Sequence, residues 1–295
     1  MPIPHVRAAR LPVRIAVALT ASAAVLAVFS CSTTDGTSTP SASSPAKSSS
    51  DRATPKAPSA VTLPPVHAGF DYQIGGSYPP PAGVSIVSRD HGDSPAPGIY
   101  TICYVNAFQV QSGAEQEWDA DLLLRDANGD IVYDPNWNEA LLDISTDAKR
   151  GRVAQKVNGW FNECAAKGFN AVEPDNYDSY TRSEDLLSAA DAETFESMLV
   201  ACSHQQNLAI AQKNAVELAP DRQRVGLDFA VAEQCGQYSE CGLYIDAFGG
   251  SVFDVEYTAR GLAAACSGWG DRISIVQRDL DVVPAGSPGY VRHTC

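Results

Sequence analysis

The amino-acid sequence predicts an α/β protein whose parallel strands form a (β/α)8 barrel. Eight short runs of β-branched or aromatic residues recur along the chain, and helix-like stretches separate most of them. This alternation favours a parallel sheet covered by helices, and the region from residue 66 to 295 is about as long as a typical barrel. An open doubly wound sheet is the alternative. No Gly-x-Gly-x-x-Gly motif follows a predicted strand, so nucleotide binding has no support.

The first three predicted strands cover residues 70–74, 84–87 and 99–105. They are short apolar or aromatic runs that end in polar or glycine-rich loops. Residues 106–146 are less regular, and apolar runs on both sides of the Asp-Ala-Asn-Gly-Asp sequence at 126–130 predict a β-hairpin. We interpret this segment as an insertion after the third strand.

Helices alternate with strands in the second half of the chain. Apolar residues at i, i+4, i+7 and i+8 predict a helix over residues 147–167, and Gly168 is a typical helix end. Further helices are predicted at 189–206 and 258–267, with a short helix or loop at 217–224. The remaining predicted strands are 169–173, 208–211, 227–232, 252–256 and 273–276.

The N-terminal segment has the pattern of an export signal. Residues 1–30 combine a basic start with an apolar stretch that is too short for a confident transmembrane helix. The sequence at 28–31, Val-Phe-Ser-Cys, resembles a bacterial lipobox, which predicts that Cys31 becomes a lipid-bearing N-terminus. A soluble secreted protein with an incidental cysteine is the alternative. Residues 31–65 are rich in Ser, Thr, Pro and Ala, which predicts a flexible tether before the folded domain at 66–295.

The chain is acidic, with a formal net charge of -14 at pH 7. The predicted export signal contains basic residues and no acid, so the exported part is more acidic still. This charge argues against nucleic acid as a partner, because phosphate contacts need a basic surface. It suits a cationic or neutral ligand, but it could also serve only to keep an exported protein soluble. We expect a membrane-anchored or secreted monomer.

Seven cysteines follow Cys31, and an exported chain meets conditions in which disulfides form. Cys103 lies in a strand-like run and is the candidate for a buried thiol. The spacing of the cysteines does not resemble a zinc site. Although the connectivity cannot be fixed from sequence, the candidate pairs are Cys235 with Cys241, Cys266 with Cys295, and Cys164 with Cys202.

Acidic clusters follow two predicted strands at matching places. Glu173 and Asp175 lie at the end of the fourth strand, and Glu233 follows the sixth. In a parallel barrel the carboxyl ends of the strands meet in one mouth, and two carboxylates there suffice to break a glycosidic bond. Burial would raise the pKa of Glu233 toward that of a general acid, although a neighbouring Lys or Arg could instead neutralise it.

Other polar residues at strand ends are candidates for substrate binding. Asp178 could equally cap a helix, and Lys213 could equally form a structural ion pair. No Gly-x-Ser-x-Gly motif is present, which argues against a serine hydrolase. The full set of binding candidates is Asp71, Asp90, Tyr104, Glu173, Asn176, Asp178, Tyr180, Lys213, Asn214, Glu256 and Tyr257.

The combined motifs resemble glycoside hydrolase family 114. The matching segments are Glu-Pro-Asp-Asn at 173–176, Gln-Lys-Asn at 212–214 and Phe-Ala-Val-Ala-Glu-Gln-Cys at 229–235. The characterised activity of that family is endo-α-1,4-polygalactosaminidase. The resemblance implies a galactosamine-containing polymer as substrate, Asp175 as nucleophile and Glu233 as acid/base.

We therefore expect an exported glycosidase that needs no metal or organic cofactor. A retaining mechanism predicts carboxyl groups about 5–5.5 Å apart, whereas an inverting pair would lie roughly 6.5–9.5 Å apart. A carbohydrate-binding lipoprotein on a barrel without catalysis is the rival hypothesis, because a fold alone does not confer activity.

Overall fold

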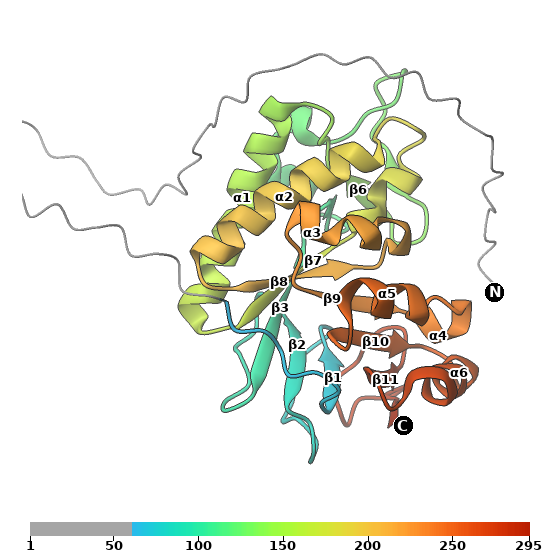
Figure 1. Ribbon diagram of the computed structural model, residues 1–295. Coiled ribbons are helices and arrows are strands. Elements are labelled where there is room, and N and C mark those ends of the chain that lie inside the picture. The colour runs from blue at the N-terminus through green and yellow to red at the C-terminus, as the bar shows by residue number, and fades with distance from the viewer. Residues whose placement is uncertain (1–60) are drawn as a thin grey trace, which may run out of the picture. The chain divides into compact units, whose positions relative to one another are not determined.

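The computed structural model describes residues 61–295, and its centre is a curled sheet of parallel strands (Figure 1). Neighbouring strands pair in the order β1-β2-β3-β7-β8-β9-β10-β11, and β12 (Arg292–Thr294) adds to β11 in the antiparallel direction. The fold is the predicted (β/α)8 barrel. Its parallel strands are β1 (Phe70–Gln73), β2 (Ile86–Asp90), β3 (Tyr100–Asn106), β7 (Ala171–Asp175), β8 (Ala209–Lys213), β9 (Phe229–Glu233), β10 (Val252–Glu256) and β11 (Ser274–Arg278).

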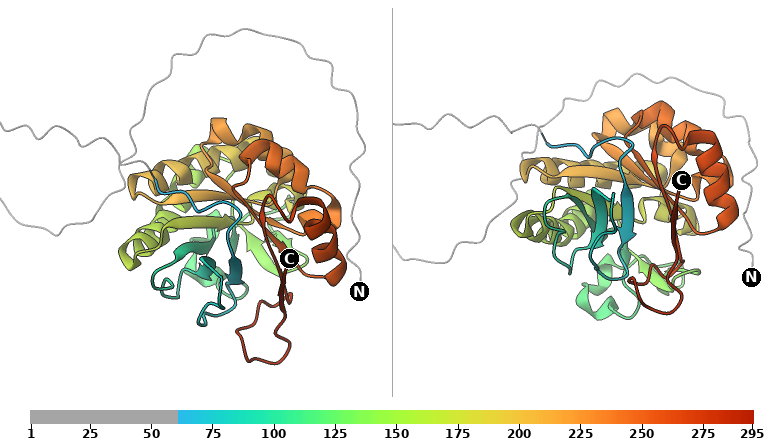
Figure 2. Two further views of the ribbon diagram at one scale, coloured as in Figure 1. Left: turned by 60° about the horizontal axis from the view of Figure 1, so that its bottom comes forward. Right: turned by 90° about the horizontal axis from the view of Figure 1, so that it is seen from below.

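Helices cover the outside of the strands from β3 onward. In Figure 2 the green-to-red helices lie along the outside of the sheet, whereas the blue-green segment that holds β1 and β2 contributes only strands and loops. The α-helices are α1 (Asp147–Lys167), α2 (Ala189–Gln205), α3 (Arg222–Val225), α4 (Cys235–Tyr238), α5 (Cys241–Phe248) and α6 (Ala259–Trp269). The 3-10 helices are η1 (Glu115–Glu117), η2 (Ala120–Leu122), η3 (Tyr177–Arg182) and η4 (Val216–Asp221).

The ends of the two long helices follow from local sequence. The Thr146 side chain accepts a hydrogen bond from the backbone N–H of Lys149 at the start of α1, and Gly168 ends α1 with a left-handed φ of 93°. At the start of α2, Ser188 and Asp191 form a capping box in which each side chain accepts from the other residue's backbone. The observed helix α1 has the predicted boundaries, 147–167, whereas α2 ends one residue before the predicted end at 206.

The insertion between β3 and α1 is more elaborate than a hairpin. A turn at Asp126 joins the bridged residues Arg125 and Ile131, as the sequence predicts. In addition, β4 (Gln109–Val110), β5 (Tyr133–Asp134) and β6 (Glu139–Leu141) form a separate antiparallel sheet in the order β4-β6-β5. This sheet gives the insertion a fixed structure next to the carboxyl ends of the barrel strands.

Two apolar cores lie on opposite faces of the barrel sheet. The inner core includes Phe70, Phe229 and Phe253. The ring centroid of Phe253 lies 5.3 Å from that of Phe70 and 5.8 Å from that of Phe229. The outer core, which includes Val172 and Ala230, lies between the sheet and the helices. Because side chains alternate along a strand, this division decides which residues face the barrel interior.

Three disulfides occur in the described chain, and one of them corrects the sequence interpretation. The pairs Cys235–Cys241 and Cys266–Cys295 are present. The pairing of Cys164 with Cys202 is wrong, because Cys164 is bonded to Cys103. Cys103 belongs to the outer core, where α1 covers β3, so its side chain points toward the helix that carries Cys164. Cys202, in α2, is a buried thiol.

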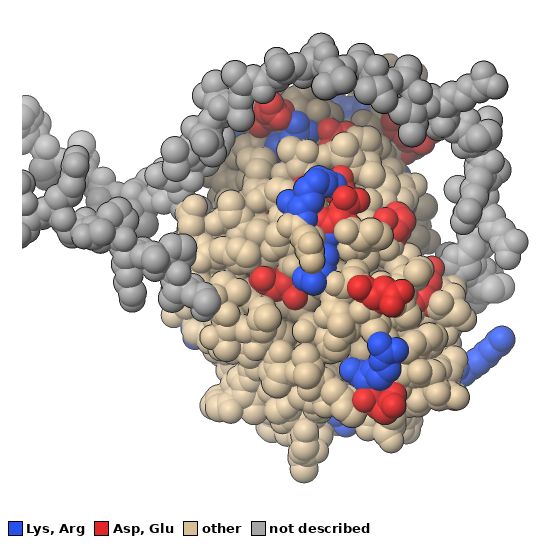
Figure 3. All heavy atoms as spheres, viewed as in Figure 1, with Lys and Arg blue, Asp and Glu red and all other residues tan. Residues whose placement is uncertain are grey.

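The surface described by the structure is mixed in charge. On the helix-covered face in Figure 3, blue basic groups lie among red acidic groups. An example is Arg224, whose guanidinium lies 2.6 Å from Glu193 and 3.2 Å from Asp221. Within residues 61–295, none of the helices has the length and apolar character that crossing a membrane requires. The predicted export signal, Cys31 and most of the predicted tether lie outside the described residues.

Candidate active site

A layer of polar side chains lies above the apolar interior of the barrel, at the carboxyl ends of its strands. On β7, Glu173 and Asp175 face the same side as Ala171 of the inner core, because residues two places apart share a face. Glu233 follows Val231 on β9 in the same way. The layer consists of Tyr72, Ser88, Tyr104, Glu173, Asp175, Lys213, Glu233 and Tyr257.

Lys213, at the end of β8, is the centre of this layer. Its Nζ lies 3.0 Å from Asp175 Oδ1 and 3.4 Å from both Glu173 Oε1 and Glu233 Oε2. Burial alone would lower the pKa of Lys213, but the three carboxylates outweigh burial and raise it well above its ordinary value. The ammonium therefore stays charged at neutral pH and offsets part of the negative charge of the three acids around it.

Asp175 is held as a carboxylate. Tyr104 donates a hydrogen bond of 2.6 Å to Oδ2, and Lys213 donates one of 3.0 Å to Oδ1. Burial works against the charged form, but Lys213, Tyr104 and the backbone N–H of Asn176 outweigh it and hold the pKa of Asp175 below its ordinary value. The side chain remains 16% exposed, so an ionised oxygen can reach a molecule in the barrel mouth.

Glu173 lies deeper and is fully buried. Its oxygens accept hydrogen bonds of 2.8 Å from Tyr72 and 2.6 Å from Ser88. Burial raises the pKa of Glu173, although Lys213 and these hydrogen bonds oppose the rise. Tyr72 also accepts a hydrogen bond of 3.0 Å from Lys213. Glu173 thus pairs with the Lys213 ammonium but does not line the cavity.

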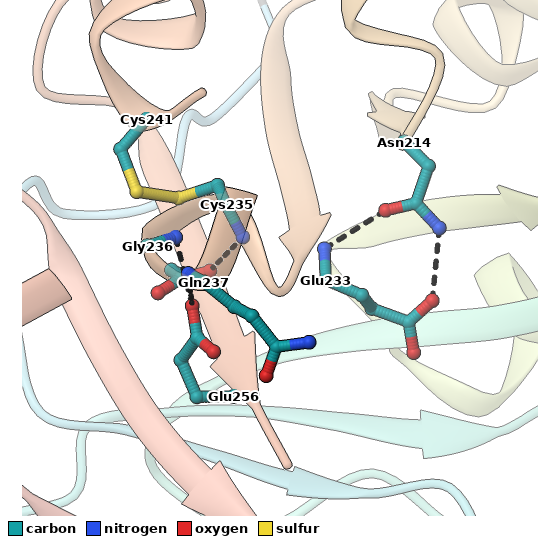
Figure 4. The surroundings of a disulfide bond; sticks show 8 residues. Asn214, Glu233, Cys235, Gly236, Gln237, Cys241 and Glu256 are labelled. Atoms are coloured by element: carbon teal, nitrogen blue, oxygen red, sulfur yellow. Dashed lines mark hydrogen bonds between the residues drawn. A yellow bond between two sulfur atoms is a disulfide. The ribbon is translucent and has the colours of Figure 1, made fainter. Parts of the chain in front are cut away.

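Glu233 is oriented by the side chains of two neighbouring strand ends. Asn214 Nδ2 donates to Glu233 Oε2, and the backbone N–H of Glu233 donates to Asn214 Oδ1, both at 2.8 Å (Figure 4). Tyr257 donates a hydrogen bond to the other carboxylate oxygen, Oε1. Asn214 has a left-handed φ of 52°, a conformation that Asn adopts more readily than most residues. The Glu233 carboxyl is therefore fixed while its side chain stays 24% exposed.

The loop after Glu233 is held by a disulfide and by a second acid. Figure 4 shows Glu256 beneath the Cys235–Cys241 bond, where its Oε1 accepts the backbone N–H groups of Gly236 and Gln237 at 2.8 and 3.1 Å. Burial raises the pKa of Glu256. This acid faces the helices rather than the barrel interior, since it alternates with Val255 of the inner core.

One group of potential metal ligands occurs in the described residues, next to the same loop. The ligand atoms of Cys235, Cys241 and Asp254 lie within 4.8 Å of one another. The two sulfur atoms are bonded to each other, so neither is available as a thiolate. Asp254 instead accepts a hydrogen bond of 3.2 Å from the backbone N–H of Cys235. The group does not fit a metal site while the disulfide is intact.

Five side chains of the polar layer line a cavity of about 460 Å³: Tyr104, Asp175, Lys213, Glu233 and Tyr257. Asp175, Lys213 and Glu233 lie in this cavity together with residues of the insertion. The loop after β11 forms another part of the wall through Leu280 and Val282. The remaining lining residues are Ile74, Gly75, Asp90, Gln111, Asp134, Asn136, Trp137, Glu139, Asn176, Asp178, Arg182, Asn214 and Asp281.

The model of glycoside-hydrolase family GH114 matches residues 50–295. The chain belongs to family GH114. It is therefore a glycoside hydrolase, a class of enzyme that commonly uses a pair of carboxyl groups. No curated protein matches the chain significantly.

Two solved structures have a similar barrel fold. The Aspergillus fumigatus Ega3 structure, a complex with galactosamine, is 23% identical and superposes with a TM-score of 0.65 over 80% of this chain and 98% of that one. The glycoside hydrolase domain of PelA from Pseudomonas aeruginosa is 15% identical, with a TM-score of 0.51 over 78% of this chain and 98% of the other. At these levels of sequence identity, the similarity shows that the chains share a fold.

Most of the sequence-predicted residues of the GH114 site line the cavity, but four do not. Asp71 is buried, accepts a hydrogen bond of 2.7 Å from Tyr78 and lies 3.1 Å from Arg292. Tyr180 donates a hydrogen bond to Glu217 outside the cavity. Glu173 and Glu256 have the supporting positions described above. The predicted residues that do line the cavity are Asp90, Tyr104, Asp175, Asn176, Asp178, Lys213, Asn214, Glu233 and Tyr257.

Sequence reasoning missed two groups of residues in the candidate site, besides Arg182 and the loop residues Ile74, Gly75, Leu280, Asp281 and Val282 of the cavity. Tyr72 and Ser88 belong to the polar layer, and their position could have been found from strand alternation, because each lies two residues after an inner-core residue. The insertion gave no such signal, since its irregular sequence does not reveal which side chains return to the barrel mouth. Its cavity residues are Gln111, Asp134, Asn136, Trp137 and Glu139.

Proposed function

We propose that this GH114 chain cleaves an α-1,4-linked polysaccharide that contains galactosamine. The observation that carries the proposal is the meeting of two carboxylates, Asp175 and Glu233, at one ammonium group in the cavity. The Ega3 structure, which shares the fold, is a complex with galactosamine. A protein with a net charge of -14 also suits a polymer whose free amino groups are cationic.

In the proposed mechanism Asp175 is the nucleophile and Glu233 is the acid/base. Asp175 attacks the anomeric carbon while the glycosidic C–O bond breaks, and Glu233, which the mechanism requires to be protonated when the substrate binds, gives its proton to the leaving oxygen. Water then attacks the glycosyl-enzyme, Glu233 accepts a proton from that water, and the Asp175 carboxylate is released. Between turnovers, Lys213 and Tyr104 keep Asp175 ionised and oriented.

The geometry around Lys213 favours retention of the anomeric configuration. Asp175 Oδ1 and Glu233 Oε2 can be no farther apart than the sum of their distances to Nζ, which are 3.0 and 3.4 Å. For these two oxygens the limit lies just under the carboxyl separation of roughly 6.5–9.5 Å of inverting enzymes, so the closer spacing supports the retaining mechanism.

The test is to incubate the purified protein with partially deacetylated α-1,4-galactosaminan. We expect oligosaccharides by mass spectrometry, and proton NMR of the first turnovers should show reducing ends with the α configuration. A product that first appears as the β anomer would contradict the retaining mechanism. A well-folded protein that gives no product, but binds the polymer on a glycan array, would instead indicate the rival carbohydrate-binding function.

We also propose that residues 1–30 are removed on export, that Cys31 carries a lipid and that residues 31–65 form a spacer. The three disulfides of the described chain support an oxidising location. Mass spectrometry of the N-terminal peptide from the membrane fraction should find a diacylglycerol on Cys31. An unmodified N-terminus on protein recovered from the medium would contradict the anchor and favour a secreted enzyme.

A further inference from the structure

The insertion between β3 and α1 places an exposed aromatic ring in the wall of the active-site cavity. Trp137 lines the cavity and is 56% exposed. Leu280, which is also exposed, lines the same cavity, so two large apolar side chains face it among polar groups. An exposed apolar patch with a polar rim is typical of a ligand-binding groove. Sugar rings have apolar faces of C–H groups, and aromatic side chains commonly contact ligands that are apolar on one side and polar on the other.

Glu139, two residues later, is a buried acid of the same cavity. It is 7% exposed, and its two oxygens accept hydrogen bonds of 2.9 Å each from the amide groups of Asn106 and Gln111. These donors are neutral, so they orient the carboxylate without balancing its charge. Among the salt bridges of residues 61–295, none involves Glu139.

The other acids near Glu139 already have cationic partners. Asp134 lies 2.6 Å from Arg182 Nε, and Asp178 lies 2.8 Å from a terminal nitrogen of the same guanidinium. Asp175 is paired with Lys213. Glu139 is therefore the carboxylate in this part of the cavity that is best placed to bind a cation brought by a ligand, through charge-assisted hydrogen bonds.

A chain of hydrogen bonds connects Glu139 to the catalytic residues. Asn176, which follows Asp175, donates to Asn106 at 3.0 Å, and Asn106 in turn donates to Glu139 at 2.9 Å. The position of Glu139 is thus fixed relative to the nucleophile. A sugar bound there would be a neighbour of the sugar whose bond is cleaved.

We propose that Trp137 and Glu139 form a sugar-binding subsite beside the catalytic pair, in which Trp137 stacks on a sugar ring and Glu139 binds the protonated amino group of that sugar. The inference rests on the proposed function and names the residues that select a free amino sugar. An N-acetyl group carries no charge and offers a single N–H, so it cannot replace the ammonium at Glu139. The subsite would favour deacetylated stretches of the polymer.

Kinetics with matched substrates test the subsite. The substrates are α-1,4-galactosamine oligomers of one length, either fully deacetylated or fully N-acetylated. Glu139→Gln should raise KM for the deacetylated oligomer roughly 10- to 100-fold, as expected for loss of a charge-assisted hydrogen bond, and KM for the acetylated oligomer far less. Trp137→Ala should raise KM for both oligomers. Glu117→Gln, a change at an exposed acid of the same insertion, is the control that should alter neither.

The pH dependence of binding gives a second measurement that a purely structural role would not affect. Burial raises the pKa of Glu139 to about 7; Asp175 and Asp134 add to the rise, whereas Asn106 and Arg182 oppose it. An ammonium ligand should displace the Glu139 proton. In a Glu233→Gln background, affinity for the deacetylated oligomer should therefore increase from pH 5.5 to pH 7, and adding Glu139→Gln should remove that increase.

The outcomes separate this inference from the proposed function. If the unmodified enzyme neither binds nor cleaves either oligomer, both the polymer and the subsite are wrong. If it cleaves the oligomers but Glu139→Gln changes KM equally for both, or leaves the pH dependence of affinity intact, the subsite alone is overturned. Loss of the preference for the deacetylated oligomer together with the loss of pH dependence supports it.

Discussion

Replacing Asp175 with Asn is expected to lower kcat on galactosamine oligomers by a factor on the order of 10⁴ or more. An amide cannot form the glycosyl-enzyme, and it loses the charge that Lys213 and Tyr104 hold in place. Binding of the oligomer should change much less than turnover. Steady-state kinetics and calorimetric titration of the same variant measure the two effects separately.

The matched control is Asp185→Asn, which makes the same chemical change at an exposed loop position. The left-handed φ of 60° at Asp185 is one that Asn also accepts, so this control should fold and react like the unmodified enzyme. If Asp175→Asn retained a tenth or more of the activity, Asp175 would not be the nucleophile.

Replacing Lys213 with Met should have the second-largest effect, and it should affect stability as well as activity. Removing one partner of a buried ion pair costs about 3–5 kcal/mol, because the remaining charges stay buried without compensation. Lys213 forms ion pairs with three carboxylates. We expect a lower midpoint of urea unfolding at pH 7 and an almost inactive enzyme, since burial would then raise the pKa of Asp175 and favour its neutral form.

The effect of pH on Lys213→Met has a definite sign. In the unmodified enzyme the pKa of Asp175 is lowered, so its contribution to stability is present at neutral pH and is lost as pH falls. In the variant, protonation of the unpaired carboxyls relieves the destabilisation as pH falls. The stability difference between the two proteins should therefore be largest near pH 7 and shrink toward pH 4.

Lys149→Met is the control for that series. Lys149 pairs with Asp143 near the start of α1, and its side chain is 32% exposed. A partly exposed ion pair of this kind contributes about 0–1 kcal/mol, so this variant should unfold close to the unmodified protein. A stability difference between Lys213→Met and the unmodified enzyme that does not depend on pH would show that packing, rather than charge, is what Lys213 contributes.

The barrel and the positions of Asp175 and Glu233 in its mouth could be predicted from sequence because both depend on local patterns. Each strand is a short apolar run, and Asp175 and Glu233 are the last residues of β7 and β9. In the second half of the chain the predicted strands begin one or two residues early, as for β7 and β8, except β10, which has the predicted boundaries. Hydrophobicity locates the buried middle of a strand, but its polar carboxyl end continues the backbone pairing.

Side-chain parity would have improved the list of binding candidates. Glu256 alternates with the inner-core residue Val255, and Asp71 alternates with Phe70 and Tyr72, so neither acid could face the same interior as those neighbours. Lys213 lies two and four residues after Ala211 and Ala209 of the inner core, so its side chain is on the same face of β8 and does face the barrel interior. A position at a strand end therefore does not identify a binding residue unless its side chain also lies on the interior face of the sheet.

Other features depend on contacts between distant segments and could not be read locally. The bond between Cys103 and Cys164 joins residues 61 positions apart, and it forms because α1 packs back onto β3. Trp137 and Glu139 enter the cavity because the sheet β4-β6-β5 folds the insertion over the strand ends. Neither arrangement has a repeating sequence pattern from which it could be inferred.

The last strand, β12, has a consequence for producing the protein. It pairs with β11 at one end of the sheet order and therefore covers backbone groups that another chain could otherwise pair with. Apart from the continuous backbone, the covalent link described between this end of the chain and the rest of the fold is the disulfide from Cys295 to Cys266 in α6. Expression in a reducing cytoplasm would leave this strand held only by its pairing with β11 and by the contacts of Arg292 with Phe70 and Asp71. Aggregation through an exposed sheet edge is then the failure to expect, and expression in an oxidising compartment should prevent it.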